Sequence, residues 1–139
     1  MVLLCVFVLL FFINRGEKVE TIYDAARAGD LQMVQGFLWD LTPRGDIREK
    51  DEHGRTPLHY AAEENHVNLF CILTPDNIDH VDDEGNTPLH LAAMNGHFDA
   101  VMGLHAAGAL TNILKKEGNL AFDLARKNGH EYICGYLKM

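Results

Sequence analysis

The sequence predicts an all-α fold, in which short helix-turn-helix units stack into a solenoid and carry hairpin-like finger loops. A run at 56–62 returns almost unchanged at 87–93. An Asp-x-x-Gly turn at 51–54 returns at 82–85 with the same spacing. Apolar residues make up 47% of the chain of 139 residues, enough to bury a core. Together these observations predict one short repeat array.

The repeat divides the chain into four units. The run Thr-Pro-Leu-His-Tyr-Ala-Ala at 56–62 returns as Thr-Pro-Leu-His-Leu-Ala-Ala at 87–93, and Asn-Gly-His at 95–97 returns at 128–130. A fainter copy at 24–31 aligns with 60–67. Neither helix of a unit can bury its apolar face alone, so the units must stack. We therefore expect one domain over 20–139, with units at about 20–48, 49–79, 80–112 and 113–139.

Each unit is expected to begin with a turn and a short first helix, best seen in the third unit. Gly85 closes the turn, because glycine tolerates a positive φ. Thr87 is expected to cap the helix, and Pro88 fits the first helical position, where no N–H is needed. The apolar residues that follow share one face at helical spacing; they are Leu89, Ala92 and Ala93.

A second helix is expected after each Gly-His or Asn-His pair. Gly96 ends the first helix, and Asn65 takes the same place in the second unit, because Asn tolerates the left-handed conformation best after Gly. The inner stripe of the second helix in the third unit is predicted as Phe98, Val101, Met102 and either Leu104 or His105. Two cysteines fall at apolar positions of second helices and are predicted as buried small hydrophobes, namely Cys71 and Cys134.

The terminal units depart from the repeated run. The first unit has Glu-Thr-Ile-Tyr at 20–23, which suits a polar end cap. The fourth unit has Leu-Ala-Phe-Asp at 120–123, so Asn119 is expected to cap its first helix. The two clear units fix the interpretation, and the outer two follow from their spacing.

At this point the sequence resembles the ankyrin repeat family over most of its length, 20–139. The Thr-Pro-Leu-His run, the Ala-Ala pair and Gly-His carry the resemblance, at a spacing of about 33 residues. It implies a non-catalytic module that binds other proteins. It also implies structural roles for His59 and His90, whose imidazoles would bond the preceding Thr and the neighbouring loop.

The segment Met1–Ile13 is entirely apolar, and 14–19 is read as a linker. A helix of that length reaches only about 20 Å, short of the ~30 Å hydrocarbon core. A secretory signal lacks its basic start, and Asn-Arg-Gly at 14–16 is a poor cleavage site. An anchor, a signal and an artefact of the terminus all stay open. An anchor would place Arg15 and Lys18 on the cytoplasmic side.

The residues do not favour an enzyme, a cofactor or a metal ion. The chain has no serine, which excludes every serine nucleophile, and no Gly-rich phosphate loop with Lys. Its three cysteines form no Cys-x-x-Cys pair. Equivalent histidines lie one repeat apart, too far to share a metal ion whose bonds are about 2 Å long. The acidic run at 76–85 lacks the ligand spacing of a calcium loop.

Charge is distributed unevenly and suggests a binding face. The net charge is −8, and the stretch 56–114 contains no Lys or Arg and eight acidic residues, so it accounts for the whole net charge. Such a chain is a poor candidate for nucleic acid, which needs clustered cations. Simple solvation of exposed loops and the steering of a basic protein partner both explain the acidity.

The resemblance to ankyrin repeats implies that the finger tips and the exposed positions of the first helices line one concave face. Carried over position by position, that face is acidic in repeats two and three and basic in repeat four. We expect this face to bind a protein partner and the repeats to lie in the cytoplasm, associated with a membrane if Met1–Ile13 is an anchor. The alternative is that the chain is a fragment of a larger ankyrin-repeat channel or scaffold protein. The oligomeric state stays open. The predicted protein-binding residues are Glu52, His53, Arg55, Glu63, Glu64, Asp83, Glu84, Asn86, Met94, Asn95, Lys116, Glu117, Asn119, Lys127 and Asn128.

Overall fold

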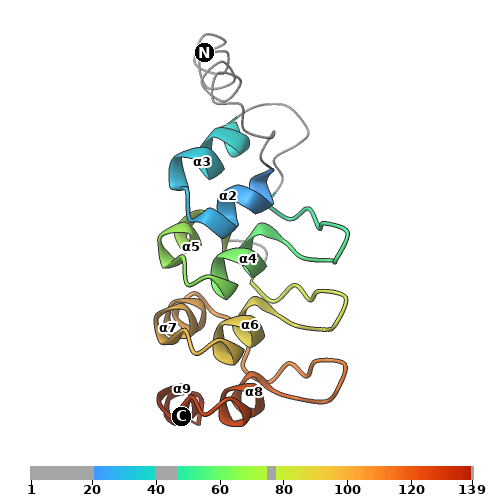
Figure 1. The fold of residues 1–139 in the computed structure, drawn as a ribbon, viewed down its shortest axis with the longest axis vertical. Helices are drawn as coiled ribbons and strands as arrows, with labels where there is room; N and C mark the ends of the chain where they lie inside the picture. The colour runs from blue at the N-terminus through green and yellow to red at the C-terminus, as the bar shows by residue number, and fades with distance from the viewer. Residues whose placement is uncertain (1–20, 40–46, 75–77, 139) are drawn as a thin grey trace.

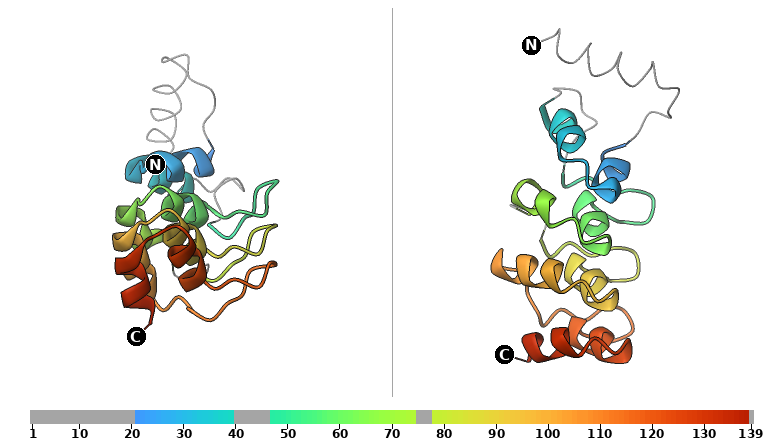
Figure 2. Two further views of the ribbon diagram at one scale, coloured as in Figure 1. Left: turned by 60° about the horizontal axis from the view of Figure 1, so that its bottom comes forward. Right: turned by 60° about the vertical axis from the view of Figure 1, so that its left-hand side comes forward.

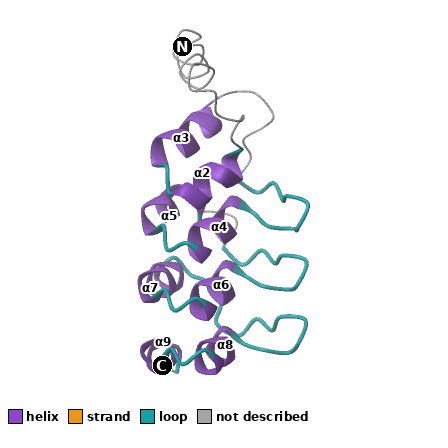
Figure 3. Cartoon of the chain, in the orientation of Figure 1, coloured by secondary structure: helices purple, strands orange, loops and turns teal. Residues whose placement is uncertain are grey.

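The computed structural model describes residues 21–39, 47–74 and 78–138, and these ranges contain helices and loops but no strand (Figure 3). The segment Met1–Ile13 and the linker 14–19 lie outside the described residues. Along the chain the helices are α2 (Ile22–Ala28), α3 (Leu31–Trp39), α4 (Pro57–Glu63), η1 (Val67–Leu69), α5 (Phe70–Leu73), α6 (Pro88–Met94), α7 (Phe98–Ala106), α8 (Ala121–Lys127) and α9 (Glu131–Leu137).

The helices form two layers that run the length of the stack (Figure 1). The first helices of the repeats, α2, α4, α6 and α8, pack on one another in order, and each packs on the second helix of its own repeat. The finger loops all project from the side of the first helices, away from α3, α5, α7 and α9 (Figure 2). This arrangement confirms the all-α solenoid that the sequence predicts.

The repeated run forms the first helices as expected. Thr87 has extended backbone and its hydroxyl accepts the His90 N–H at 3.3 Å, so it caps α6, with Pro88 at the first position. The alanines behind the cap are fully buried, as are their equivalents in α4. Small side chains at these positions let neighbouring helices approach closely, which is what stacking requires.

The turn between the two helices of a repeat has a left-handed residue, and a histidine of the next repeat covers Gly29 and Gly96. Gly29, Gly96 and Gly129 have φ of 74°, 76° and 77°, and Asn65 takes the same conformation at 62°, as predicted. A Cβ on Gly96 would lie 2.5 Å from the His130 ring. The same imidazole lies 3.0 Å from the Met94 carbonyl oxygen, so it donates a hydrogen bond to the preceding repeat.

Two expectations for the second helices were wrong. In α7 the buried residues are Ala100, Val101 and Leu104, whereas Phe98 and Met102 are 37% and 44% exposed and His105 is exposed too. Val101 belongs to both possible stripes, and packing against α6 selects the one that contains Leu104. Cys71 is exposed, so its predicted burial was wrong, whereas Cys134 is half-buried and packs against the core.

The cap of α8 also differs from expectation. Leu120 is the residue before the helix, and the Asp123 carboxylate accepts its N–H at 2.9 Å. Asn119 lies one residue too early to cap. Its carbonyl oxygen instead accepts a bond from His90 Nε2 at 3.2 Å, which joins repeats three and four.

Candidate protein-binding face

Two of the fingers are each held in shape by bonds from backbone N–H groups to an aspartate. We call residues 47–55, 78–86 and 111–119 fingers two, three and four. In finger two, Asp51 accepts the N–H groups of His53 and Arg55, both at 2.9 Å. In finger three, Asp82 accepts those of Glu84 at 3.0 Å and Asn86 at 2.8 Å. Fingers two and three therefore have a fixed backbone, which presents each tip to solvent in a defined place.

Neighbouring fingers are bonded to one another. The Asp83 N–H donates to the His53 carbonyl at 3.1 Å, and the Lys116 N–H donates to the Glu84 carbonyl at 3.3 Å. The Lys50 ammonium also donates to the Val81 carbonyl at 2.9 Å. Because these contacts repeat along the stack, the three finger tips form one continuous edge.

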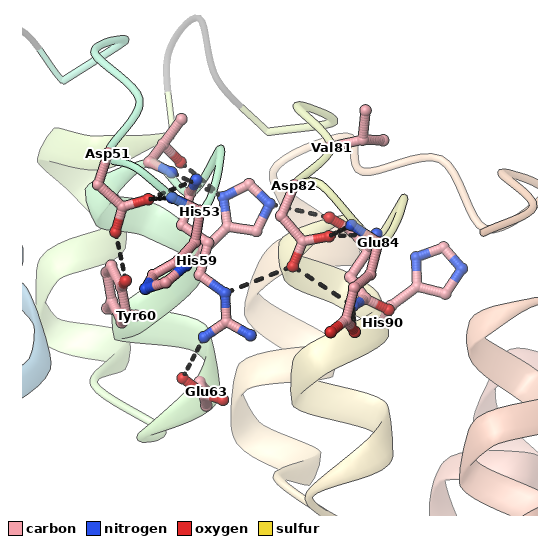
Figure 4. Close-up of polar contacts among 12 residues, drawn as sticks. Asp51, His53, His59, Tyr60, Glu63, Val81, Asp82, Glu84 and His90 are labelled. Atoms are coloured by element: carbon pink, nitrogen blue, oxygen red, sulfur yellow. Dashed lines mark hydrogen bonds and ion pairs between the residues drawn. The ribbon is translucent and has the colours of Figure 1, made fainter. Parts of the chain in front are cut away.

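A buried histidine ties each central helix to the next finger (Figure 4). His59 Nδ1 accepts the Thr56 N–H at 3.1 Å, so its Nε2 carries the proton and donates to the Asn86 carbonyl at 2.9 Å. Burial lowers the pKa of His59 from 6.5 to about 4, and burial also lowers the pKa of His90. Both rings are thus neutral structural links, which confirms the role that the resemblance implied.

Arg55 sits between the helices and the fingers, where it is surrounded by carboxylates. Its guanidinium contacts Glu63 at 2.9 Å and Asp82 at 3.4 Å. Burial lowers the pKa of Arg55, but the charges of Glu63 and Asp82 outweigh this and raise it. One cation and two carboxylates leave this group with one net negative charge, and the arginine is already occupied.

Tyr60 completes the same network from α4. Its hydroxyl donates to Asp51, and the guanidinium carbons of Arg27 and Arg55 lie 4.5 and 5.5 Å from its ring centroid. Burial, followed by the bond to Asp51, raises the pKa of Tyr60 to about 12. Burial alone would raise the pKa of Asp51, but the bonds from Tyr60 and from the backbone of Arg55 and His53 lower it.

The structure divides the predicted face residues into three groups by exposure. The exposed residues of the predicted face are Glu52, His53, Glu64, Asp83, Glu84, Asn95, Lys116, Glu117, Lys127 and Asn128. The half-buried ones are Arg55, Glu63, Met94 and Asn119. Arg55 and Glu63 are bonded to each other, so they are less available to a partner than the exposed group.

Asn86, the third group, corrects the sequence-based face. It is only 2% exposed, and its side chain donates to Asp82 at 3.3 Å and to Glu84 at 3.2 Å. The Asn therefore stabilises finger three from inside and does not lie on the exposed surface. Asp83 and Glu84 are exposed at the tip of finger three, whereas Asn86 is buried at its base, so position within the repeat alone did not predict its exposure.

Sequence reasoning missed the residues that position this face. Asp51 and Asp82 were recognised as turn residues, but their second oxygens also bind Tyr60 and Arg55. The signal was available, because Tyr60 stands where the other clear repeat has Leu91, a polar departure inside a buried run. A buried hydroxyl needs a partner, and the nearest finger supplies one.

Across 21–39, 47–74 and 78–138, no three His, Cys, Asp or Glu side chains gather to hold a metal ion. A shallow hollow lies at the turns of repeats three and four, away from the fingers, and its lining includes Phe98, His130 and Tyr132. No helix in the described ranges has the length and apolar character needed to cross a bilayer.

Comparison with known proteins identifies the repeat. A family model for three copies of ankyrin repeats matches residues 5–82, 22–114 and 71–139. The chain is also 32% identical over 62 residues to acyl-CoA-binding domain-containing protein 2 of Arabidopsis thaliana. That match covers 45% of this chain and 17% of the relative. The family matches span nearly the whole sequence, and ankyrin repeats are in general protein-interaction modules. The chain belongs to the ankyrin repeat family.

Proposed function

We propose that this chain is a non-catalytic adaptor that binds a basic protein segment across repeats two and three. One observation carries the proposal. Glu64, Asp83 and Glu84 are exposed and have no ion-pair partner among the described residues, while Arg55, at the base of finger two, is bonded to Glu63 and Asp82. The exposed carboxylates therefore present a negative surface that Arg55 is not free to neutralise.

The geometry favours protein over a small ligand. Asp83 and Glu84 lie at the tip of finger three, on the edge that the finger hydrogen bonds hold in place, and Glu64 lies at the end of α4. A rigid edge loses little entropy when a partner binds. Charges on such an edge accelerate encounter and select the partner more than they add to affinity, so binding should weaken with salt.

Partners captured from lysate and identified by mass spectrometry provide the test, followed by affinity measurement with the purified partner. Asp83→Lys/Glu84→Lys should lose the partner. Asp99→Lys/Glu131→Lys is the matched control, because both residues are exposed on second helices and the change in net charge is the same. If the two double variants bind the partner equally well, the acidic residues of the fingers serve only to keep the loops solvated, and this proposal is wrong.

We propose, as a second function, that Met1–Ile13 tethers the adaptor to the cytoplasmic face of a membrane. The observation in favour is the unbroken apolar run of this segment, with Arg15 and Lys18 shortly after it. Membrane fractionation of the whole chain beside a chain that starts at Asn14 tests this. Equal distribution of the two chains would rule out the tether and leave the adaptor function untouched.

A further inference from the structure

Equivalent positions along the stack form two rows, an exposed one on the fingers and a partly exposed one at the ends of the first helices, and both change from acidic to basic in the same direction. The finger row consists of the equivalent tip residues Glu52, Asp83 and Lys116. The helix row consists of the equivalent residues at the ends of α4, α6 and α8, which are Glu63, Met94 and Lys127. In both rows the second repeat is acidic and the fourth is basic, although the rows belong to different elements.

Contacts show that the two rows border one face. Arg55, at the base of finger two, reaches Glu63 of the helix row at 2.9 Å (Figure 4). The same arginine reaches Asp82 of finger three at 3.4 Å, next to Asp83 of the finger row. The Asn95 side chain donates to the Glu63 carbonyl at 3.3 Å, so the ends of α4 and α6 are also neighbours.

The cations of repeat four differ in whether they are already used. Lys115 pairs with Glu117 at 3.4 Å, Arg126 with Asp123 at 3.8 Å, and Lys138 lies 5.6 Å from the Phe122 ring centroid. Lys116 and Lys127 are exposed and have no ion-pair partner among the residues described. The two cations that stand in the rows are thus the ones available to another molecule.

We infer that the partner of this face is a dipolar segment, with a basic stretch that lies over repeats two and three and an acidic stretch over repeat four. The inference rests on the proposed function and adds the acidic stretch and the orientation. Stacked helices lie about 10 Å apart, and an extended chain advances about 3.3 Å per residue, so one repeat corresponds to about three partner residues. A basic block of about four residues spans repeats two and three.

Four labelled peptides and the whole chain test this by fluorescence anisotropy at low salt. Two are block peptides of opposite order: one has four lysines, two glycines and then four glutamates, and the other has the same blocks reversed. The third has the same composition with lysine and glutamate alternating. The fourth, the glutamine peptide, is the first block peptide with every glutamate replaced by glutamine. Both block peptides should bind more tightly than the alternating and glutamine peptides, since each can lie along the face in the direction that matches both signs.

The variant Lys116→Glu/Lys127→Glu should weaken the binding of both block peptides about five-fold and strengthen the binding of the glutamine peptide. Arg126→Glu/Lys138→Glu is the matched control, with the same charge change at exposed cations outside the rows, and should have little effect. Equal affinity for the block peptides and the glutamine peptide, unchanged by the row variant, overturns this inference while the basic-partner proposal survives. If Asp83→Lys/Glu84→Lys leaves all peptide affinities unchanged, the proposed function itself fails.

Discussion

Acid should destabilise the folded repeats through His59 before the carboxylates titrate. The ring is fully buried, its Nδ1 accepts the Thr56 N–H, and its Nε2 donates to Asn86, so the folded state has no place for a second proton. The pKa of His59 is about 4 when folded and 6.5 when unfolded. Between these values the unfolded state binds more protons, so stability is present above pH 6.5 and is lost as the pH falls towards 4.

The size of the loss follows from the two pKa values. Lowering the pH from about 7.5 to about 5 should cost about 2 kcal/mol at His59, and His90 adds to it in the same direction. Urea unfolding followed by far-UV circular dichroism measures the loss. His59→Gln should lower stability at neutral pH and remove most of its share of the pH dependence. His53→Gln, at an exposed finger tip, is the matched control.

A direct titration guards against a variant that fails to fold. The imidazole resonance of His59 in the whole folded chain should stay in its neutral position at pH values near 5.5, where a free histidine is mostly protonated. A midpoint near 6.5 would refute the reasoning, because a ring that charges freely cannot be the buried link described here. An unchanged pH dependence in His59→Gln would do the same.

Three further predictions concern the glycines between the helices of a repeat, Tyr60 and Arg55. Gly129→Ala should cost about 1 kcal/mol from its positive φ alone, whereas Gly96→Ala, with nearly the same φ but the His130 ring against it, should cost at least twice as much in thermal unfolding. Tyr60→Phe should lose about 1 to 2 kcal/mol by removing the bond to the Asp51 carboxylate, and equal melting temperatures would contradict that bond. Arg55→Met should destabilise the fold by about 2 kcal/mol or more, because it leaves the buried Asp82 carboxylate without its cation; Arg55→Lys should recover part of the loss.

Much of the fold could be predicted because the repeated run encodes caps, turns and spacing locally. Thr87, Pro88 and Asn65 each adopt the conformation that their own chemistry favours, whatever surrounds them. The buried face of α7 could not be predicted in this way. Phe98 with Met102 and Val101 with Leu104 both have the spacing of an apolar stripe on a helix. Only the packing partner decides between them, and a single sequence does not specify how α7 is rotated.

The candidate face was predictable in outline and less so in detail. Exposure of Asp83, Glu84 and Lys116 follows from their place at the finger tips. The burial of Asn86 and the pairing of Arg55 with Glu63 depend on side chains that meet only when the fingers fold over the helices. Sequence spacing gives the position of a residue within its repeat, but not which neighbouring side chain forms an ion pair with it.

The hydrogen bonds that histidines make between repeats also affect how the repeats unfold. The two helix-to-finger bonds, from His59 and His90, join repeats two, three and four, while repeat four has Asp123 where repeats two and three have histidine. Repeat four is held to repeat three by the bonds of His90 and His130, so replacing either histidine should speed amide exchange with deuterium in α8 and α9. A partner that lies across both rows would stabilise repeat four against local unfolding, so its binding should be detectable as slower amide hydrogen exchange in that repeat.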